Sequence, residues 1–232
     1  DGAQWRSCAA DEPRAGDTSA WRVRLSDEAR GSGELADHWD AKYQGLGADR
    51  PSWYQSVPQA SLDLIESVAT PASGIVDVGG GDSCLVDQLL ARGFHDLTVV
   101  DISQVALMAA HDRIGESPVH WVASDIRDWQ PTRTFDVWHD RAAYHFLVEP
   151  ADQQAYWQLV RDSVPHGGHV IVAHFADDGP DSCSGLPVQR YDEGQIRAAM
   201  GDGFEIVEQR REQHSTPWES TQSFLWTLAR RA

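Results

Sequence analysis

The hydrophobic residues of this chain gather in short runs separated by longer amphipathic segments. Five apolar runs of strand length lie at 75–78, 97–101, 119–125, 134–140 and 169–175. Amphipathic segments with helical spacing lie between them, at about 83–92, after Ser103 and at about 151–163. Ser103 suits an N-cap because its hydroxyl can accept a hydrogen bond from the first turn. This alternation predicts a parallel sheet with helices on both faces.

The two ends of the chain differ from this alternating core. Residues 1–34 are polar without a steady period, so we expect a flexible N-terminal extension before a folded domain at 35–232. Short helices are expected near 35–43, 61–68 and 193–200, and strands at 204–212 and 221–228. The predicted fold is therefore α/β, a doubly wound, mostly parallel seven-stranded sheet with one antiparallel strand.

The turn after the first apolar run is rich in glycine and acid. Residues 75–83 read Ile-Val-Asp-Val-Gly-Gly-Gly-Asp-Ser, and the next apolar run ends on Asp101. Glycines let a backbone approach a ligand closely, and an acid at the end of the second strand can accept hydrogen bonds from both ribose hydroxyls. The pattern predicts a nucleoside site that contains Gly79, Gly80, Gly81, Ser83, Asp101 and Ile102.

Two nucleoside cofactors compete for this turn. A dinucleotide site needs a third glycine, where Cys84 stands here, and Asp77 and Asp82 would repel a pyrophosphate. S-adenosylmethionine (SAM) carries a sulfonium and an ammonium group, which suit two nearby carboxylates. Asp125 ends the third apolar run, where it suits the adenine amino group, and Ile126 follows it. We therefore expect SAM as the cofactor, and a nicotinamide oxidoreductase is the less favoured interpretation.

In their order along the chain, these features resemble the class I SAM-dependent methyltransferases. The resemblance covers residues 36–230 and implies a Rossmann-like methyltransferase fold, with SAM as methyl donor and S-adenosylhomocysteine (SAH) as product. Residues 39–43, Trp-Asp-Ala-Lys-Tyr, are similar to a Trp-Asp-x-x-Tyr segment that covers the cofactor in several subfamilies. The resemblance thus adds Trp39 and Tyr43 to the expected cofactor site. Trp53 and Tyr54 could extend this aromatic cover, and ordinary helix packing is the alternative.

Candidate catalytic residues follow the fourth apolar run, in the segment Trp-His-Asp-Arg-Ala-Ala-Tyr-His-Phe at 138–146. His139 or His145 could remove a proton from the acceptor, since imidazole titrates near neutral pH. Asp140 could orient the acceptor. The alternative is a structural ion pair between Asp140 and Arg141, with the aromatic residues in the core.

Substrate contacts are expected from two segments. Arg141 and Tyr144 belong to the segment after the fourth run, and Cys183 and Arg190 belong to the Gly- and Pro-rich loop after the fifth. Loops at this edge of an open sheet commonly shape an acceptor pocket. A plain surface connection is the alternative for the loop.

The identity of the acceptor is left open by these motifs. Asp140-Arg-Ala142 resembles a protein-lysine methyltransferase subgroup in which an acid, a lysine and a glycine follow the fourth strand and a second acid comes later. In this chain His145 stands near the position of that second acid, and the carboxylate is missing. This difference favours a small-molecule acceptor with an N, O or S nucleophile. A protein-lysine N-methyltransferase is the alternative, and a non-catalytic SAM-binding regulatory module is a hypothesis from another class.

Charge and cysteine content narrow the partners and the compartment. Nineteen basic and thirty-six acidic residues give a net charge of −17, which disfavours nucleic acids and anionic membranes as partners. No apolar run approaches the roughly 20 residues of a membrane span, and no charged-then-apolar leader is visible. Cys8, Cys84 and Cys183 have no paired spacing, so we expect reduced thiols and a cytoplasmic protein. The ten histidines lack metal-ligand spacing, so no metal is expected.

Overall fold

The computed structural model describes residues 32–45 and 51–232. Residues 1–31, and with them most of the predicted N-terminal extension, lie outside the described residues. The last residues of that extension are helical, because helix α1 (Ser32–Gly45) begins at Ser32. No helix in the described ranges is long and apolar enough to cross a membrane.

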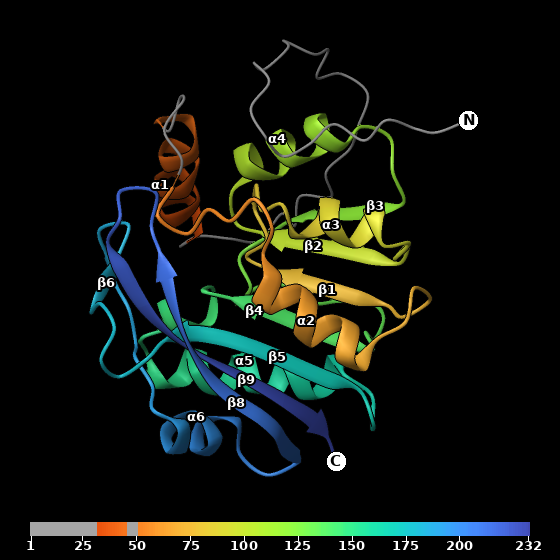
Figure 1. The fold of residues 1–232 in the computed structure, drawn as a ribbon, viewed down its shortest axis with the longest axis vertical. Helices are drawn as coiled ribbons and strands as arrows, with labels where there is room; N and C mark the ends of the chain where they lie inside the picture. Colours follow the sequence, from red (N-terminus) through yellow and green to blue (C-terminus); the bar gives the residue numbers. More distant parts are fainter. Residues whose placement is uncertain (1–31, 46–50) are drawn as a thin grey trace.

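The core of the fold is a seven-stranded sheet with the strand order β3-β2-β1-β4-β5-β9-β8 (Figure 1). Strands β1 to β5 pair in parallel, and β9 runs antiparallel to both β5 and β8. The predicted doubly wound sheet with one antiparallel strand is therefore confirmed. The strands are β1 (Ile75–Val78), β2 (Leu97–Asp101), β3 (Val119–Ala123), β4 (Val137–Arg141), β5 (His169–Phe175), β8 (Phe204–Ser215) and β9 (Thr221–Arg231).

Helices cover both faces of the sheet (Figure 1). Buried leucines of α2 (Gln59–Val68), α3 (Leu85–Ala91) and α4 (Gln104–Ile114) belong to one hydrophobic cluster. The buried hydrophobic residues of α5 (Pro150–Ser163) and α6 (Glu193–Met200) belong to a second cluster on the opposite face. This three-layer arrangement buries the central strands on both sides, which is why they read as nearly continuous apolar runs.

Local signals explain where several helices begin. The Ser103 hydroxyl accepts a hydrogen bond from the Ala106 amide at 3.1 Å, which confirms the predicted N-cap of α4. Asp192 and Gln195 form a reciprocal capping box at the start of α6. Pro150 occupies the first turn of α5, where no amide donor is needed.

The loop after β5 contains structure that the sequence pattern did not predict. It folds into a small antiparallel hairpin of β6 (Ser182–Cys183) and β7 (Leu186–Pro187). Ser184 and Gly185 form its two-residue turn, with φ of 54° and 84°, as a type I′ turn requires. Alternating apolar residues cannot reveal strands of two residues, so this hairpin escaped the pattern analysis.

Candidate functional site

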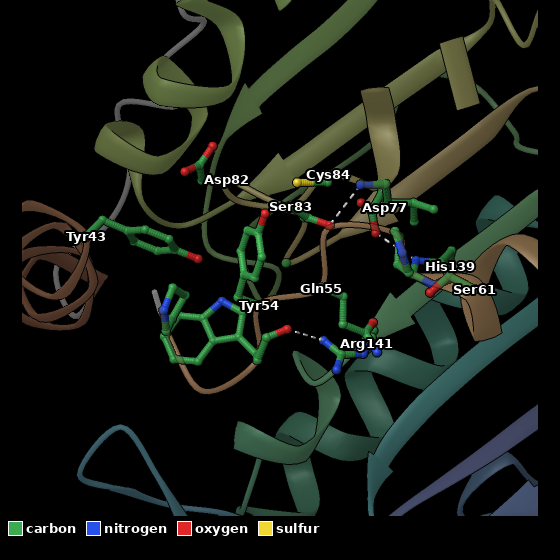
Figure 2. Close-up of a pocket in the computed structure, with 16 residues that line it drawn as sticks. Tyr43, Tyr54, Gln55, Ser61, Asp77, Asp82, Ser83, Cys84, His139 and Arg141 are labelled. Atoms are coloured by element: carbon green, nitrogen blue, oxygen red, sulfur yellow. Dashed lines mark hydrogen bonds and ion pairs between the residues drawn. The ribbon is translucent and has the colours of Figure 1, made fainter. Parts of the chain in front are cut away.

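Two adjoining cavities lie at the carboxyl ends of the central strands. The larger has a volume of about 260 Å³, and the smaller, shown in Figure 2, has a volume of about 70 Å³. Tyr43, Trp53, Gly79 and Arg141 line both, so the two cavities form one site. Ligands of open α/β sheets bind at this edge.

The glycine turn after β1 forms the floor of the site. Gly79 and Gly81 have φ of 68° and 46°, a left-handed conformation that glycine adopts without strain. A β-carbon on Gly81 would lie 2.5 Å from the Tyr43 hydroxyl oxygen and 3.1 Å from Asp101 Oδ2. Gly80 and Ser83 line the smaller cavity beside Gly79. A side chain at Gly81 would therefore collide with Tyr43, which lines both cavities.

Asp101 marks the nucleoside end of the site. It ends β2, lines the larger cavity and is buried, and its Oδ1 accepts a hydrogen bond from the Ser103 amide at 2.7 Å. Burial raises the pKa of Asp101 to about 7. Ile102 and Ile126 line the same cavity and offer apolar surface for a base.

Asp125 forms an ion pair with Arg127. Arg127 donates to both carboxylate oxygens of Asp125, through Nε at 3.0 and 3.1 Å and through Nη2 at 2.6 Å. Asp125 lines the larger cavity as predicted, but an adenine amino group would have to share a carboxylate that is already paired with a guanidinium.

Asp77 and Asp82 have cationic or imidazole partners in the protein. Asp77 Oδ1 lies 2.7 Å from His139 Nδ1, and His139 Nε2 lies 3.0 Å from the Ser61 hydroxyl (Figure 2). Asp82 forms an ion pair with Arg113. The sequence predicts that these two acids suit a cationic ligand, but in the structure the charge of Asp82 is paired with Arg113. Asp77 and His139 both line the smaller cavity as a buried, connected pair.

An aromatic cover closes the site from the side of α1. Trp39 and Tyr43 line the larger cavity, and Trp39 packs edge-on against Trp53 and Phe146 with ring centroids 5.9 and 5.2 Å apart. Asp40 holds this helix in place, because its Oδ1 accepts hydrogen bonds from the Ser103 hydroxyl at 2.6 Å and the Val105 amide at 3.2 Å. Each defined position of the Trp-Asp-x-x-Tyr segment therefore has a distinct place in the structure.

The structure puts Asp140 on the opposite face of the sheet from His139. Successive side chains of a strand point to opposite faces, so His139 faces α2 and Asp140 faces α5. The Asp140 carboxylate accepts hydrogen bonds from the Tyr156 hydroxyl at 2.6 Å and from the amides of Ala143 and Tyr144. Asp140 is fully buried and lines neither cavity. This placement corrects the expectation that Asp140 contacts the acceptor.

Tyr144 and His145 are core residues. Tyr144 is fully buried, and its hydroxyl accepts from Trp157 Nε1 and lies 3.0 Å from the Tyr191 hydroxyl. His145 is equally buried, and desolvation lowers its pKa to about 3. Neither residue lines a cavity. The structure therefore does not bring Tyr144 to the substrate or His145 to a position from which it could remove a proton.

Of the three remaining predicted substrate residues, two line the larger cavity and one lies outside both cavities. Arg141 and Cys183 line the larger cavity. Arg190 lies outside both cavities, where its Nη1 donates to the Gly179 carbonyl at 2.9 Å and braces the loop. Cys183 is a free thiol, whereas Cys84 is disulfide-bonded, which corrects the expectation of reduced thiols throughout.

Several lining residues escaped the sequence analysis. Phe224 and Gln222 come from β9, Arg127 follows β3, and Ser61 comes from α2. They reach the site through sheet order and helix packing rather than through a local motif. His214 belongs to β8 and is buried, with Nε2 2.7 Å from the Ser52 carbonyl oxygen.

The described residues fit SAM. Gly79 lines both cavities with no side chain to occupy them, and Asp101 offers a carboxylate beside the apolar surface of Ile102 and Ile126. Asp77 with His139 offers a buried polar pair at the smaller cavity, under the aromatic cover. These features match the ribose, base and amino-acid ends of the cofactor.

Known methyltransferases are similar to parts of this chain. A family model described as a methyltransferase domain matches residues 75–168. EEF1A lysine methyltransferase 4 from Bos taurus is 29% identical over 130 residues, 55% of this chain and 50% of that protein. Trans-aconitate 2-methyltransferase from Mycobacterium ulcerans is 31% identical over 113 residues, 47% of this chain and 40% of that protein. The chain thus spans half or less of the length of these curated relatives.

Solved structures share the whole fold. The Burkholderia thailandensis 1,6-didemethyltoxoflavin-N1-methyltransferase, solved with its substrate and SAH, superposes with a TM-score of 0.67 at 19% identity, over 96% of this chain and all of that one. At this identity the likeness concerns the fold, and the family match covers the segment that contains the glycine turn and Asp101. These likenesses, to a methyltransferase-domain model over residues 75–168 and to methyltransferases in sequence and in fold, support a SAM-dependent methyltransferase.

Proposed function

We propose that this protein transfers the methyl group of SAM to a small-molecule acceptor. The observation that carries the proposal is the shape of the larger cavity. It extends from the nucleoside end at Asp101 past Arg141 to Phe175, Cys183 and Phe224, which we call the acceptor end. A cavity of about 260 Å³ favours a compact acceptor over a bulky one.

The residues that would hold the cofactor follow from their positions. Asp101 would accept from the ribose hydroxyls, Ile102 and Ile126 would enclose the base, and Asp77 with His139 would hold the amino-acid end. SAM supplies a methyl group on a sulfonium, so the S–CH₃ bond breaks as the bond from the acceptor nucleophile to the methyl carbon forms. Trp39, Tyr43 and Trp53 would exclude water and offer ring faces to positive charge.

The acceptor side of the reaction depends mainly on orientation. Asp140 supports the turn that carries Ala142 and Ala143 to the cavity, and it acts through that backbone. His139 is the imidazole that lines the site, but both of its ring nitrogens have hydrogen-bond partners. Rate enhancement would therefore come from holding the acceptor in line with the methyl group.

Protein-lysine methylation is the second candidate function, and the EEF1A lysine methyltransferase relative favours it. The trans-aconitate methyltransferase relative favours a small acid instead. The Arg141 guanidinium weighs against lysine, because it lies beside the acceptor end, where it would repel an ammonium group. A role as a non-catalytic SAM-binding module accounts less well for a cavity that continues beyond the cofactor.

The proposal is tested first by calorimetric titration with SAH and NADH. A transfer assay with labelled SAM over thiols, amines and carboxylic acids follows. We expect SAH to bind and NADH not to bind, and we expect Asp101→Asn to weaken SAH by about 10- to 100-fold, because it loses charge-assisted hydrogen bonds. Asp162→Asn, an exposed change on α5, is the matched control. Binding of NADH without SAH would contradict the cofactor assignment. Methylation of a protein lysine but of no small molecule would select the second candidate.

A further inference from the structure

One guanidinium in the site has an unused edge. Arg141 ends β4, lines both cavities and donates through Nη1 to the Trp53 carbonyl at 3.1 Å (Figure 2). Its guanidinium carbon lies 5.0 Å from the centroid of the Phe224 ring. Its Nε and Nη2 atoms are buried and have no hydrogen-bond partner among the described residues.

The two unpaired donors lie on the same edge of the guanidinium. Nε–H and Nη2–H point in parallel, a spacing that matches the two oxygens of a carboxylate. Burial lowers the pKa of Arg141 to about 10, so the group remains charged at neutral pH. A buried charge with unpaired donors is costly, and a bound anion would offset that cost.

The nearby protein acids are already engaged. Asp77 is hydrogen-bonded to His139, and Glu212 Oε2 accepts from Trp226 Nε1 at 2.6 Å. Neither is hydrogen-bonded to Arg141. The rest of the acceptor end is apolar, with Phe175 and Phe224. The surroundings of the free edge thus suit an apolar body that carries one anionic group.

We propose that Nε and Nη2 of Arg141 bind the carboxylate of a small acceptor acid. The inference rests on the proposed function, because that function defines the acceptor end. It also fits the proton chemistry of the site: Asp140 and His145 lie outside both cavities, and His139 is held between Asp77 and Ser61. An ionised carboxylate is already a nucleophile and needs no base.

A carboxylate could also come from the cofactor, whose amino-acid end carries one. The two sources predict different results for Arg141→Gln, which removes the charge and the parallel donors. If the acceptor supplies the carboxylate, the variant binds SAH as tightly as the wild type does. If the cofactor supplies it, the variant binds SAH more weakly, and an SAH analogue without the carboxylate binds both proteins equally.

The probe is 3-phenylpropionate, an apolar acid, compared with its neutral amide, 3-phenylpropanamide. Each is titrated calorimetrically into the full chain saturated with SAH. We expect the acid to bind at least about tenfold more tightly than the amide, and Arg141→Gln to abolish this difference. Arg141→Lys keeps the positive charge but lacks the two parallel N–H donors, so it should retain part of the affinity difference. Arg197→Gln, an exposed change on α6, should retain the whole difference.

The two titrations distinguish the carboxylate site from its alternatives. Equal affinity for acid and amide, no binding of the acid, or unchanged acid binding in Arg141→Gln would overturn the carboxylate site. If Arg141→Gln binds SAH more weakly than the wild type but binds the carboxylate-free analogue equally well, the carboxylate that Arg141 binds belongs to the cofactor. That result would overturn the acceptor site. SAH binding by each variant verifies that it is folded. Failure of the wild type to bind SAH would instead overturn the proposed function, which separates the two failures.

Discussion

Ala142 holds a left-handed backbone conformation at the edge of the larger cavity. Its φ is 71°, and its amide donates to the Ala173 carbonyl at 2.8 Å, which keeps the turn after β4 in place. An L-residue with a side chain is strained by about 1–2 kcal/mol in this region. In the protein-lysine methyltransferase subgroup that this segment resembles, glycine is expected at the corresponding position.

Ala142→Gly should therefore raise the free energy of unfolding, by about 0.5–1 kcal/mol once the greater freedom of glycine in the unfolded chain is subtracted. Ala143, the next residue, has an ordinary right-handed φ of −97°, so Ala143→Gly should lower stability by a similar amount. Urea denaturation of the two variants measures both effects. A loss of stability in Ala142→Gly would show that the turn is not strained.

Asp101 should make cofactor affinity depend on pH. Ribose hydroxyls donate to the ionised carboxylate, and burial raises the pKa of Asp101 to about 7. SAH affinity should therefore fall as the pH drops below 7, by up to about tenfold per pH unit, and should level off above 8. Titrations at several pH values measure this, and the dependence should disappear in Asp101→Asn. A dependence that persists in the variant would assign it to another group.

The residues of β4 show what a sequence can and cannot say about a site. The sequence places the segment 138–146 at the edge where the cavities lie. It also assigns catalytic or substrate roles to Asp140, Tyr144 and His145, which line neither cavity. Strand alternation alone separates His139 from Asp140, and it could have been applied to the sequence. The burial of Tyr144 and His145 depends on how η1 (Tyr144–Phe146) packs against β5, α5 and the loop before α6, which no local pattern reveals.

At the scale of elements, α1 depends on one acidic side chain. Asp40 accepts two hydrogen bonds at the start of α4. Asp40→Ala should release α1 and weaken SAH binding by about tenfold or more, because Trp39 and Tyr43 would no longer be held over the cavity. Asp37→Ala, an exposed change on the same helix, is the control. Calorimetry and amide exchange across α1 test this, and unchanged exchange in Asp40→Ala would contradict the anchoring role.

Most elements follow from local sequence because each has its own signal. Helix α6 runs from Glu193 to Met200, as the pattern predicted, since a capping box opens it and Gly201 ends it. Helix α2 and strand β8 are longer than predicted because packing extends them beyond their periodic residues. The β6–β7 hairpin is too short to leave a pattern.

At the scale of the whole molecule, charge is the dominant feature. A net charge of −17 implies self-repulsion in the folded state, which salt screens. The midpoint of thermal unfolding should therefore rise by a few degrees when NaCl is increased from about 20 mM to about 500 mM, where the Debye length falls below about 5 Å. Scanning calorimetry measures this shift. A falling midpoint would mean that ion pairs such as Arg113–Asp82 outweigh the repulsion.

The position of α1 also has a kinetic consequence. Trp39 and Tyr43 lie over the cofactor part of the site, and Asp40 fastens their helix to the same serine whose amide binds Asp101. The acceptor end is formed by strands β4, β5, β6 and β9. We expect exchange of the nucleoside to require movement of α1. If the acceptor exchanges on the side of the strands, turnover should follow a compulsory order, with the cofactor entering first and its spent form leaving last.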